Sequence, residues 1–389
     1  MSAAYALLVI GGGPAALAAA RGYRDAGGHG DVAIVSEEER MPYQRPPLTK
    51  ELLRGEMAEQ ELALEDESWL SEHSIGLISG RAVALDVDGH TATLAGGRRL
   101  TYARCVLATG AVPVRLTAPG CDDPAVRVVR SLDHVRELTH RLATGDPTIV
   151  VGSGFIGCEI ASSLRRRGHP VTLISDEPAP NQRRLGAQAG AELARWLADD
   201  GVNAHFGTGV DAIERVDGAL SVSAGDVRAE AALVVMATGV APRSELLQAC
   251  GAELQDGAIV VDDAMRTALP NVLAAGDVCV AHNATAGRRL RVEHWGNAME
   301  QGEVAGASAA GADAHWGAVP GFWSTIGAHT LKYAAWGDGY DAVRFEPGTD
   351  GGFTAWYGRA GVVVGVLAHE SDSSYEHGRQ LIAAGAAWS

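Results

Sequence analysis

Two glycine-rich turns carry the residues of this chain that are best suited to a defined chemistry, the binding of dinucleotides. Each turn follows a short apolar run and opens an alanine-rich helical stretch, which is the context of a dinucleotide-binding βαβ unit. The first glycine permits the tight bend, the second lets the backbone approach a pyrophosphate held by helix amides, and a third small residue packs helix on sheet. The turns read Gly11-Gly12-Gly13-Pro14-Ala15-Ala16 and Gly152-Ser153-Gly154-Phe155-Ile156-Gly157. Two turns predict two dinucleotides, with electrons passing between them.

Carboxylates stand after the second strand of each predicted unit, where they can accept hydrogen bonds from ribose hydroxyls. In the first unit a carboxylate about 20 residues beyond the turn suits this role, and we choose Glu37, with Glu38 as the alternative. In the second unit the strand ends at Ser175, and the carboxylates are displaced to Asp176 and Glu177. We choose Asp176 for that unit.

The choice between the two pyridine nucleotides depends on the charges that follow the second-unit strand. A carboxylate at Asp176 repels a 2′-phosphate, which favours NADH. Arg183 and Arg184 lie close by in the sequence and are able to pair with a phosphate, so NADPH stays open as the less favoured nucleotide.

A proline-rich segment follows the second strand of the first unit. Pro42, Pro46 and Pro47 restrict the backbone to extended conformations with few free amide donors. Such stiffness is expected where Arg45 and Lys50 must be held in place. Lysine is rare in this arginine-rich chain, so Lys50 is expected to serve a purpose for which arginine is unsuited.

The order of apolar runs and turns predicts three domains in a chain of 389 residues. We expect an α/β fold with two Rossmann-like three-layer nucleotide-binding domains and a small C-terminal α+β domain. The first domain is discontinuous, because an apolar run near residue 272 returns the chain to it. The predicted boundaries are 1–113 with 242–318, then 114–241, then 319–389. Predicted elements include helices at 15–26, 158–167 and from 375, a strand at 32–35, and meanders at 80–107 and 204–227.

Composition and charge argue against several classes of protein. The formal net charge of −16 disfavours nucleic acid as a partner. No apolar run is long enough to cross a membrane, and the first strand begins at once without a leader, so we expect a cytoplasmic protein with no membrane partner. The five cysteines form no C-x-x-C pair and no metal-ligand spacing, which argues against a metal site and against a dithiol disulfide reductase.

Further motifs occur in a characteristic order. They are Pro42-Tyr43-Gln44-Arg45-Pro46-Pro47-Leu48-Thr49-Lys50, the Ala-Thr-Gly triplets at 108–110 and 237–239, Ala275-Gly276-Asp277 and Val292-Glu293-His294-Trp295. With the two glycine turns, these motifs resemble those of FAD-dependent pyridine-nucleotide oxidoreductases of the ferredoxin-reductase type, over essentially the whole chain. That family includes the putidaredoxin reductases, the reductases of aromatic-ring dioxygenases and apoptosis-inducing factor.

The resemblance implies that the first domain binds FAD and the second binds NADH. It places Arg45 by the pyrophosphate, Lys50 by the isoalloxazine, and Asp277 as an acceptor on the ribityl or pyrophosphate side. The helix that opens at His294-Trp295 points at flavin N1 and O2, where a helix N-terminus stabilises negative charge. The residues implied for FAD are Gly11, Gly13, Pro14, Ala15, Ala16, Glu37, Arg45, Lys50, Val83, Ala108, Thr109, Gly110, Gly276, Asp277, Glu293, His294, Trp295 and Trp323. Those implied for NADH are Gly152, Gly154, Phe155, Ile156, Gly157, Glu159, Asp176 and Gly239.

The same resemblance places Glu159 beside Lys50, near flavin N5, where the nicotinamide stacks. A Lys50–Glu159 pair would position the lysine and balance charge as a hydride arrives, and these two are the catalytic residues we choose. Alternatively, Glu159 is a helix-start carboxylate that the helix dipole stabilises without a partner. Trp295 and Trp323 are expected to flank the flavin, with core packing as the alternative for both.

The activity implied is hydride transfer from NADH to flavin N5, followed by single-electron transfer to an iron–sulfur ferredoxin that serves a cytochrome P450 or a dioxygenase. The alternatives are an NADH oxidase, whose redox cysteine would lie near residue 42, and a redox-sensing flavoprotein like apoptosis-inducing factor. The basic residues Arg288, Arg289, Arg291 and Lys332 form either a patch for an acidic ferredoxin or an ordinary solvated surface. The chain is expected to be a monomer or a homodimer.

Overall fold

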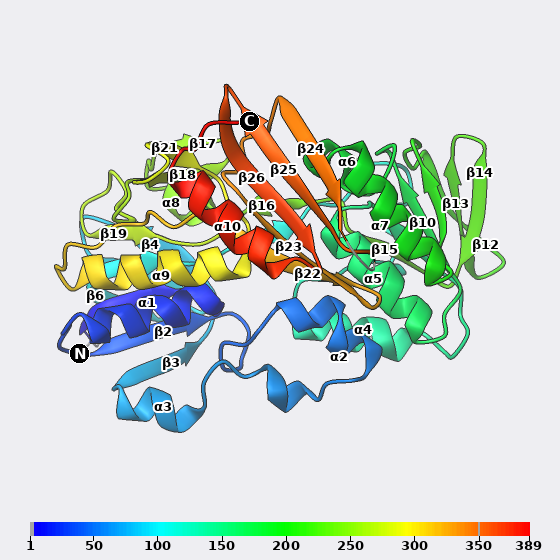
Figure 1. Ribbon diagram of the computed structural model, residues 1–389. Coiled ribbons are helices and arrows are strands. Elements are labelled where there is room, and N and C mark those ends of the chain that lie inside the picture. Colours follow the sequence, from blue (N-terminus) through cyan, green and yellow to red (C-terminus); the bar gives the residue numbers. More distant parts are fainter. Residues whose placement is uncertain (1–3, 349–350) are drawn as a thin grey trace.

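The three largest of six sheets, with their helices, meet around a common centre in the computed structural model of the chain, which describes residues 4–348 and 351–389. In Figure 1 the N-terminal strands lie at the left, the strands of the middle of the chain at the right, and the C-terminal strands cross between them. The predicted α/β class is confirmed, because parallel sheets with flanking helices carry both glycine turns.

The first sheet has the order β3-β2-β1-β6-β5-β4, and β19 also pairs with β6. Strands β1, β2, β3, β6 and β19 pair in parallel, whereas β4, β5 and β6 form the predicted antiparallel meander. Strand β2 has the apolar sequence typical of a parallel strand that is covered on both faces, and it is buried along its whole length. The bounds are β1 Ala4–Ile10, β2 Val32–Ser36, β3 Ile75–Ser79, β4 Ala82–Asp86, β5 Thr91–Leu94, β6 Arg99–Leu107 and β19 Val272–Ala274.

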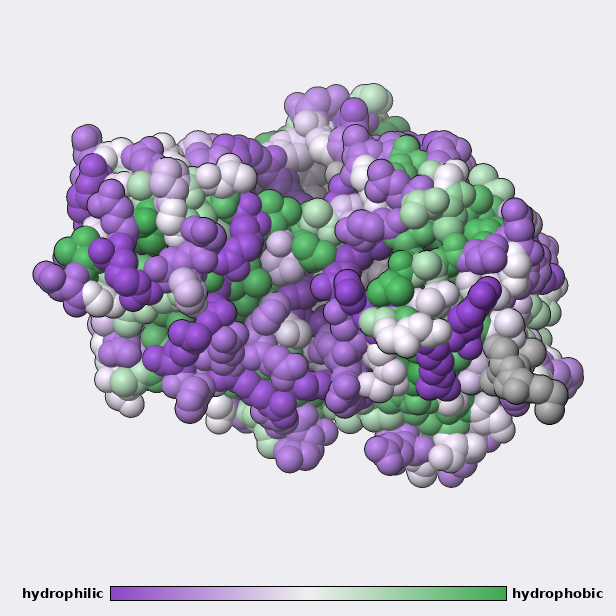
Figure 2. Space-filling view, turned by 180° about the vertical axis from the view of Figure 1, so that it is seen from behind, coloured by the Kyte–Doolittle hydropathy of each residue, from purple (hydrophilic) through white to green (hydrophobic). Residues whose placement is uncertain are grey.

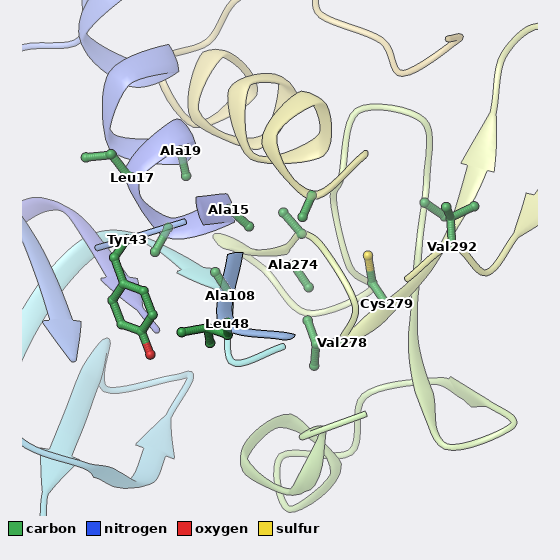
Figure 3. Close-up of a cluster of buried hydrophobic side chains, with 14 of the residues drawn as sticks. Ala15, Leu17, Ala19, Tyr43, Leu48, Ala108, Ala274, Val278, Cys279 and Val292 are labelled. Carbon is green, nitrogen blue, oxygen red and sulfur yellow. The ribbon is translucent and has the colours of Figure 1, made fainter. Parts of the chain in front are cut away.

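Two helices, α1 (Pro14–Asp25) and α9 (Trp295–Ala309), lie side by side on the first sheet. Glycines allow their backbones to approach: a Cβ on Gly302 would lie 2.4 Å from the carbonyl oxygen of Ala15, and one on Gly306 would lie 2.0 Å from that of Ala19. Figure 3 shows small side chains, Ala15 and Ala274 among them, in the buried cluster beneath these helices. The start of α9, far along the sequence, is thereby fixed next to the first glycine turn.

The second sheet is entirely parallel and has the order β11-β10-β9-β15-β8. A separate antiparallel meander, β12-β13-β14, packs against it. The strand bounds are β8 Val126–Val128, β9 Thr148–Val151, β10 Val171–Ser175, β11 Asn203–Phe206, β12 Ala212–Val216, β13 Ala219–Ala224, β14 Val227–Ala231 and β15 Leu233–Met236. The helices are α4 Leu132–Arg141, α5 Phe155–Arg166, α6 Gln182–Leu185 and α7 Ala187–Asp199.

The C-terminal sheet is antiparallel, in the order β22-β23-β26-β25-β24, and α10 packs on it. Its first strand, β22, also contacts α5 and α9, so this sheet closes the space between the other two. The bounds are β22 Gly321–Ile326, β23 His329–Ala335, β24 Ala342–Pro347, β25 Phe353–Arg359, β26 Val362–His369 and α10 Asp372–Ala383.

Short elements complete the connections between the sheets. The strands β7 and β16 pair antiparallel where the chain leaves the first sheet and returns to it. The remaining strands are β7 Ala111–Pro113, β16 Val240–Pro242, β17 Leu254–Gln255, β18 Ala258–Val261, β20 Cys279–Asn283 and β21 Arg288–Leu290. The remaining helices are η1 Pro46–Thr49, α2 Glu51–Arg54, η2 Glu59–Leu62, α3 Glu67–Glu72 and α8 Glu245–Gln248.

Three predicted elements need correction. The helix predicted at 158–167 is α5, which begins three residues earlier at Phe155, directly after its N-cap Gly154. The second meander runs over 212–231 rather than 204–227, because 203–206 forms the outer parallel strand β11. The last helix begins at Asp372, three residues before the predicted start at Tyr375. Among the described residues no helix has the length and apolar character needed to cross a membrane. Figure 2 shows mostly hydrophilic side chains on the face it presents, with a hollow between the two lobes.

Candidate functional site

One large cavity lies where the three sheets meet. Its volume is about 2070 Å³, which is well above the roughly 300–1,000 Å³ of pockets for drug-sized ligands. Its wall combines both glycine turns, the proline-rich segment, the start of α9 and strand β22. A space of this size and composition suits two extended ligands rather than one small molecule.

The first turn forms a cradle in which side chains have no room. Gly11 has a φ of 139°, and a Cβ there would lie 2.1 Å from the carbonyl oxygen of Ala108. A Cβ on Gly12 would lie 2.0 Å from Ser36 Oγ. Gly13 is the N-cap residue of α1 and provides no side-chain cap. A Cβ on Gly13 would have only Arg45 Nε nearby, at 3.9 Å. Free helix amides facing open space beside a guanidinium fit a pyrophosphate.

Charged side chains around the first turn form a sheltered network. Arg45 donates to Glu38 Oε1 at 2.7 Å and to the carbonyl oxygen of Arg130 at 2.7 Å. Arg130 donates to Asp277 Oδ2 at 2.7 Å. Tyr43 donates to Glu38 Oε2 at 2.5 Å, and desolvation by burial raises the pKa of Tyr43 to about 12, so this hydroxyl keeps its proton at neutral pH.

The same network separates Glu37 from Glu38. Glu38 is occupied by Arg45 and Tyr43, whereas Glu37 lies half exposed at the cavity wall and pairs with Arg243 at 3.0 Å. Glu37 is therefore the more exposed of the two carboxylates in the cavity wall, and its contact with a ligand ribose stays a prediction.

The catalytic pair expected from the sequence is brought together at the centre of the cavity. Lys50 Nζ lies 3.3 Å from Glu159 Oε1, and both residues are at most 5% exposed. Lys50 follows η1, and Glu159 is in the first half of α5, so the contact joins the proline-rich segment to the second glycine turn. The alternative of an unpartnered helix-start carboxylate is wrong, since Glu159 has this partner and others.

The start of α9 presents unsatisfied polar atoms to the cavity. His294, its N-cap residue, provides no side-chain cap, and both His294 Nδ1 and Trp295 Nε1 are buried without a hydrogen-bond partner among the described residues. Desolvation by burial lowers the pKa of His294 to about 3, so its ring is neutral at ordinary pH. These orphaned atoms and free amides fit a polar heterocyclic ring.

The two tryptophans of the predicted flavin site differ in exposure. Trp323 is 48% exposed and lies edge-on to Trp295, with 6.2 Å between the ring centroids. Core packing is therefore excluded for Trp323, which lies in the cavity wall. Trp295 is partly buried in the same wall.

The second turn, like the first, begins with a glycine that has a positive φ and no room for a side chain. Gly152 has a φ of 101°, and a Cβ there would lie 2.4 Å from the carbonyl oxygen of Ala237, while Gly154 faces open space. At the end of β10, Ser175 is buried and bonded to Ser153.

Of the charged residues after β10, Asp176 does not line the cavity, whereas Glu177, Arg183 and Arg184 do. Asp176 pairs with Arg183 at 3.0 Å, with both side chains more than 60% exposed. Glu177, the next carboxylate, reaches the cavity wall.

All predicted site residues line the cavity except Ala16, Gly152, Gly157 and Asp176. The first three act in packing: Ala16 is fully buried, and a Cβ on Gly157 would lie 2.0 Å from the carbonyl oxygen of Gly152. Asp176 turns toward Arg183 instead, which leaves Glu177 nearer to a ligand.

The sequence interpretation missed three residues that the structure places at the site. Arg130 and Arg243 contact predicted carboxylates, and Ser324 contacts Glu159. The arginine partners lie far apart along the chain, so no local pattern marks them. Ser324 directly follows Trp323, which the sequence analysis selected, but the Ser324 hydroxyl was given no role.

The suspected basic patch is neutralised by acidic neighbours. Each of its members forms an ion pair, so these residues make an ordinary solvated surface rather than a free cationic patch. The pairs are Arg288–Asp338 at 2.8 Å, Arg289–Glu253 at 3.2 Å, Arg291–Glu293 at 2.7 Å and Lys332–Asp372 at 2.7 Å.

Comparisons with known proteins agree with this architecture. Residues 5–302 match the family described as pyridine nucleotide-disulphide oxidoreductase. Rhodocoxin reductase of Rhodococcus erythropolis is 32% identical, over 89% of this chain and 82% of its own. The ferredoxin–NAD(+) reductase component of the anthranilate 1,2-dioxygenase system of Burkholderia cepacia is 32% identical, over 97% and 94%. A crystal structure of a ferredoxin reductase from Rhodopseudomonas palustris matches with a TM-score of 0.93 at 28% identity, covering 98% of this chain and 95% of its own.

Proposed function

The chain belongs to the pyridine nucleotide-disulphide oxidoreductase family, and from this membership and the geometry of the cavity we propose that it is an FAD-dependent NADH:ferredoxin reductase. The observation that carries the proposal is the buried Lys50–Glu159 pair, which stands between two nucleotide cradles. Relatives whose names specify ferredoxin and NAD support the choice of substrates.

We assign FAD to the unit of residues 1–113 with 242–318. Its first turn supplies free amides for the pyrophosphate, Arg45 and Arg130 supply positive charge, and Glu37 supplies ribose contacts. The positive N-terminal end of α9, at His294 and Trp295, would stabilise negative charge on the bound flavin ring. FAD held by these residues would supply a hydride acceptor for a nicotinamide and a donor of single electrons.

We assign NADH to residues 114–241 and the acceptor surface to residues 319–389. The open space before Gly154 suits the second pyrophosphate, and Glu177 rather than Asp176 faces the ligand as the carboxylate that disfavours a 2′-phosphate. Glu159 orients Lys50, whose Nζ donates to the carboxylate oxygen Oε1 at 3.3 Å. Trp323, half exposed at the cavity wall, lies where an acceptor could approach.

An iron–sulfur protein that serves a P450 or dioxygenase is the acceptor we propose. The neutralised arginines at 288–291 indicate that its docking does not depend on a free basic patch there. We place the protein in the cytoplasm, which suits its five free cysteines. Monomer or homodimer stays an open prediction.

The test of the acceptor compares ferredoxin reduction with oxygen consumption. Purified protein with NADH should reduce a two-iron ferredoxin in many turnovers, while NADH-driven oxygen uptake without ferredoxin stays slow. Rapid oxygen uptake that ferredoxin does not suppress would instead support an NADH oxidase. That alternative lacks the expected thiol, because Pro42 and Tyr43 occupy the position of its redox cysteine.

A further inference from the structure

The buried carboxylate of Glu159 receives hydrogen bonds from two distant parts of the chain. Glu159 Oε2 accepts from the hydroxyl of Thr49 at 2.5 Å, and Oε1 accepts from the hydroxyl of Ser324 at 2.7 Å and from Lys50 Nζ at 3.3 Å. Ser324 is 1% exposed and Thr49 is 7% exposed. The carboxylate thus joins the proline-rich segment, the second glycine turn and the C-terminal sheet.

The lengths of these contacts show which groups set the position of the carboxylate. Both hydroxyl contacts lie within the range of good O–H···O hydrogen bonds, whereas the ammonium contact exceeds the usual 2.7–3.2 Å of N–H···O bonds. One hydroxyl binds each carboxylate oxygen, which fixes the plane of the group. Lys50 is then held loosely, with ammonium donors left for the cavity.

The hydroxyls are themselves fixed by their surroundings. The carbonyl oxygen of Thr49 accepts from Ser163 Oγ at 2.8 Å, so Thr49 is tied to the same helix that carries Glu159. Ser324 lies within the β22–β23 ladder, opposite Leu331. Two residues earlier, Phe322 packs edge-on against Phe155 with 4.8 Å between ring centroids.

We propose that Thr49 and Ser324 are positioning residues for hydride transfer, and that their hydroxyls hold Glu159 so that it places the Lys50 ammonium at the cavity wall. The inference rests on the proposed function and adds that the C-terminal sheet takes part in the hydride step through one hydroxyl. Removing either hydroxyl leaves a buried, charged acceptor undersatisfied and free to tilt.

Variants with matched controls test this in the flavin-loaded protein. Ser324→Ala and Thr49→Val should each slow flavin reduction by NADH about tenfold, equivalent to about 1.4 kcal/mol in the barrier. Binding of NADH should change little. The control is Thr325→Val, the next residue of β22, whose hydroxyl contacts Thr330 at 2.9 Å and not Glu159. Ser324→Thr, which keeps a hydroxyl, should recover most of the rate.

Two further readouts separate positioning from general damage. The acid limb of the pH–rate profile should move to higher pH in Ser324→Ala, because the ionised carboxylate has lost a donor. The chain has lysine only at 50 and 332, so isotope-labelled lysine gives a simple NMR spectrum that Lys332→Arg assigns. The Lys50 side-chain signals should shift in Ser324→Ala and in Thr49→Val but not in Thr325→Val.

The possible outcomes distinguish this inference from the proposed function. If the wild-type flavin is reduced by NADH but Ser324→Ala and Thr49→Val match Thr325→Val in rate, pH profile and Lys50 signals, the inference is wrong and the function stands. If the wild-type flavin is not reduced, the function itself fails. Should Ser324→Ala lose its flavin, Thr49→Val, acting at the other oxygen, decides the question.

Discussion

The two glycine turns are built alike but have different surroundings. Each begins with a glycine of positive φ whose Cβ would strike a carbonyl oxygen, of Ala108 behind Gly11 and of Ala237 behind Gly152. Around the first turn the Arg45–Glu38 and Arg130–Asp277 ion pairs are no more than 27% exposed. Around the second turn the Asp176–Arg183 pair is more than 60% exposed.

This difference in exposure is what we expect if FAD stays bound at the first turn while NADH binds and leaves at the second. Sheltered charges act strongly because little water screens them, which suits a cofactor that stays bound. Exposed charges are screened and rearrange at low cost, which suits a substrate that binds and leaves in every turnover. The exposure of these ion pairs, rather than the glycine motifs, therefore supports our proposal that the first nucleotide stays bound and the second exchanges.

The largest effect is expected from alanine at the first glycine of each turn. Gly11→Ala places a Cβ against backbone at a left-handed position and should leave less than about a tenth of the flavin bound. Gly152→Ala should keep the flavin and abolish saturable NADH binding, because the same clash lies at the other nucleotide. Absorbance at the flavin band and NADH titration measure the two effects. Equal flavin loss in both variants would contradict the assignment of the turns.

Lys50→Met should give the next largest effect. It removes the cation from a buried pair, and we expect flavin reduction by NADH to slow about a hundredfold in stopped-flow traces. Lys332→Met, which removes the exposed partner of Asp372, is the control and should reduce at the wild-type rate. A Lys50→Met protein that is reduced as fast as the control would rule out a role for the pair.

Acidification should lower the free energy of unfolding through His294, an effect of intermediate size. Desolvation lowers its pKa to about 3, so the unfolded chain binds more protons between pH 3 and 6.5, and stability falls as the pH falls through that window. From pH 7.5 to 5 this group should remove about 2 kcal/mol of stability. The urea midpoint of wild type should drop accordingly, and that of His294→Gln should drop less.

The control for this pH effect is His315→Gln. Hydrogen bonds to Asp313 and Asp263 raise the pKa of the exposed His315, so its small contribution is present at low pH and lost as the pH rises. A His294→Gln protein whose acid sensitivity equals that of wild type would show that the ring is not held neutral.

The smallest effect is expected at the exposed pair beside the second turn. Arg183→Ala should leave the free energy of unfolding almost unchanged, because both partners are largely solvated. Its NADH dissociation constant should change only a few-fold in a fluorescence titration. A large loss of NADH affinity would instead make Arg183 a principal ligand contact and would weaken the contrast between the two turns.

The sequence predicted the features that depend on local pattern. The parallel strands, the meander at 80–107 and the return of the chain at β19 follow from apolar periodicity and turns, and the structure has them. The Lys50–Glu159 contact came from the resemblance rather than from periodicity, because its members lie in separate parts of the chain.

The remaining features depend on tertiary placement. Neither the Arg130–Asp277 pair nor the Ser324–Glu159 bond leaves a local pattern, since each joins segments more than a hundred residues apart. Glu177 lines the cavity and Asp176 does not, although Asp176 pairs with Arg183, and the sequence alone does not distinguish these neighbouring carboxylates. Of the two alternatives for the basic residues at 288–291 and 332, the structure favours the solvated surface, and three of the four ion pairs that decide this join residues at least 36 positions apart.

Anaerobic titration of the purified, FAD-reconstituted protein with NADH would probe most directly whether two nucleotides share this cavity. We predict a yellow protein whose visible absorbance bleaches with stoichiometric NADH and returns when oxidised ferredoxin is added. A preparation that stays colourless after incubation with FAD, or a bound flavin that NADH leaves oxidised, would contradict the proposed arrangement.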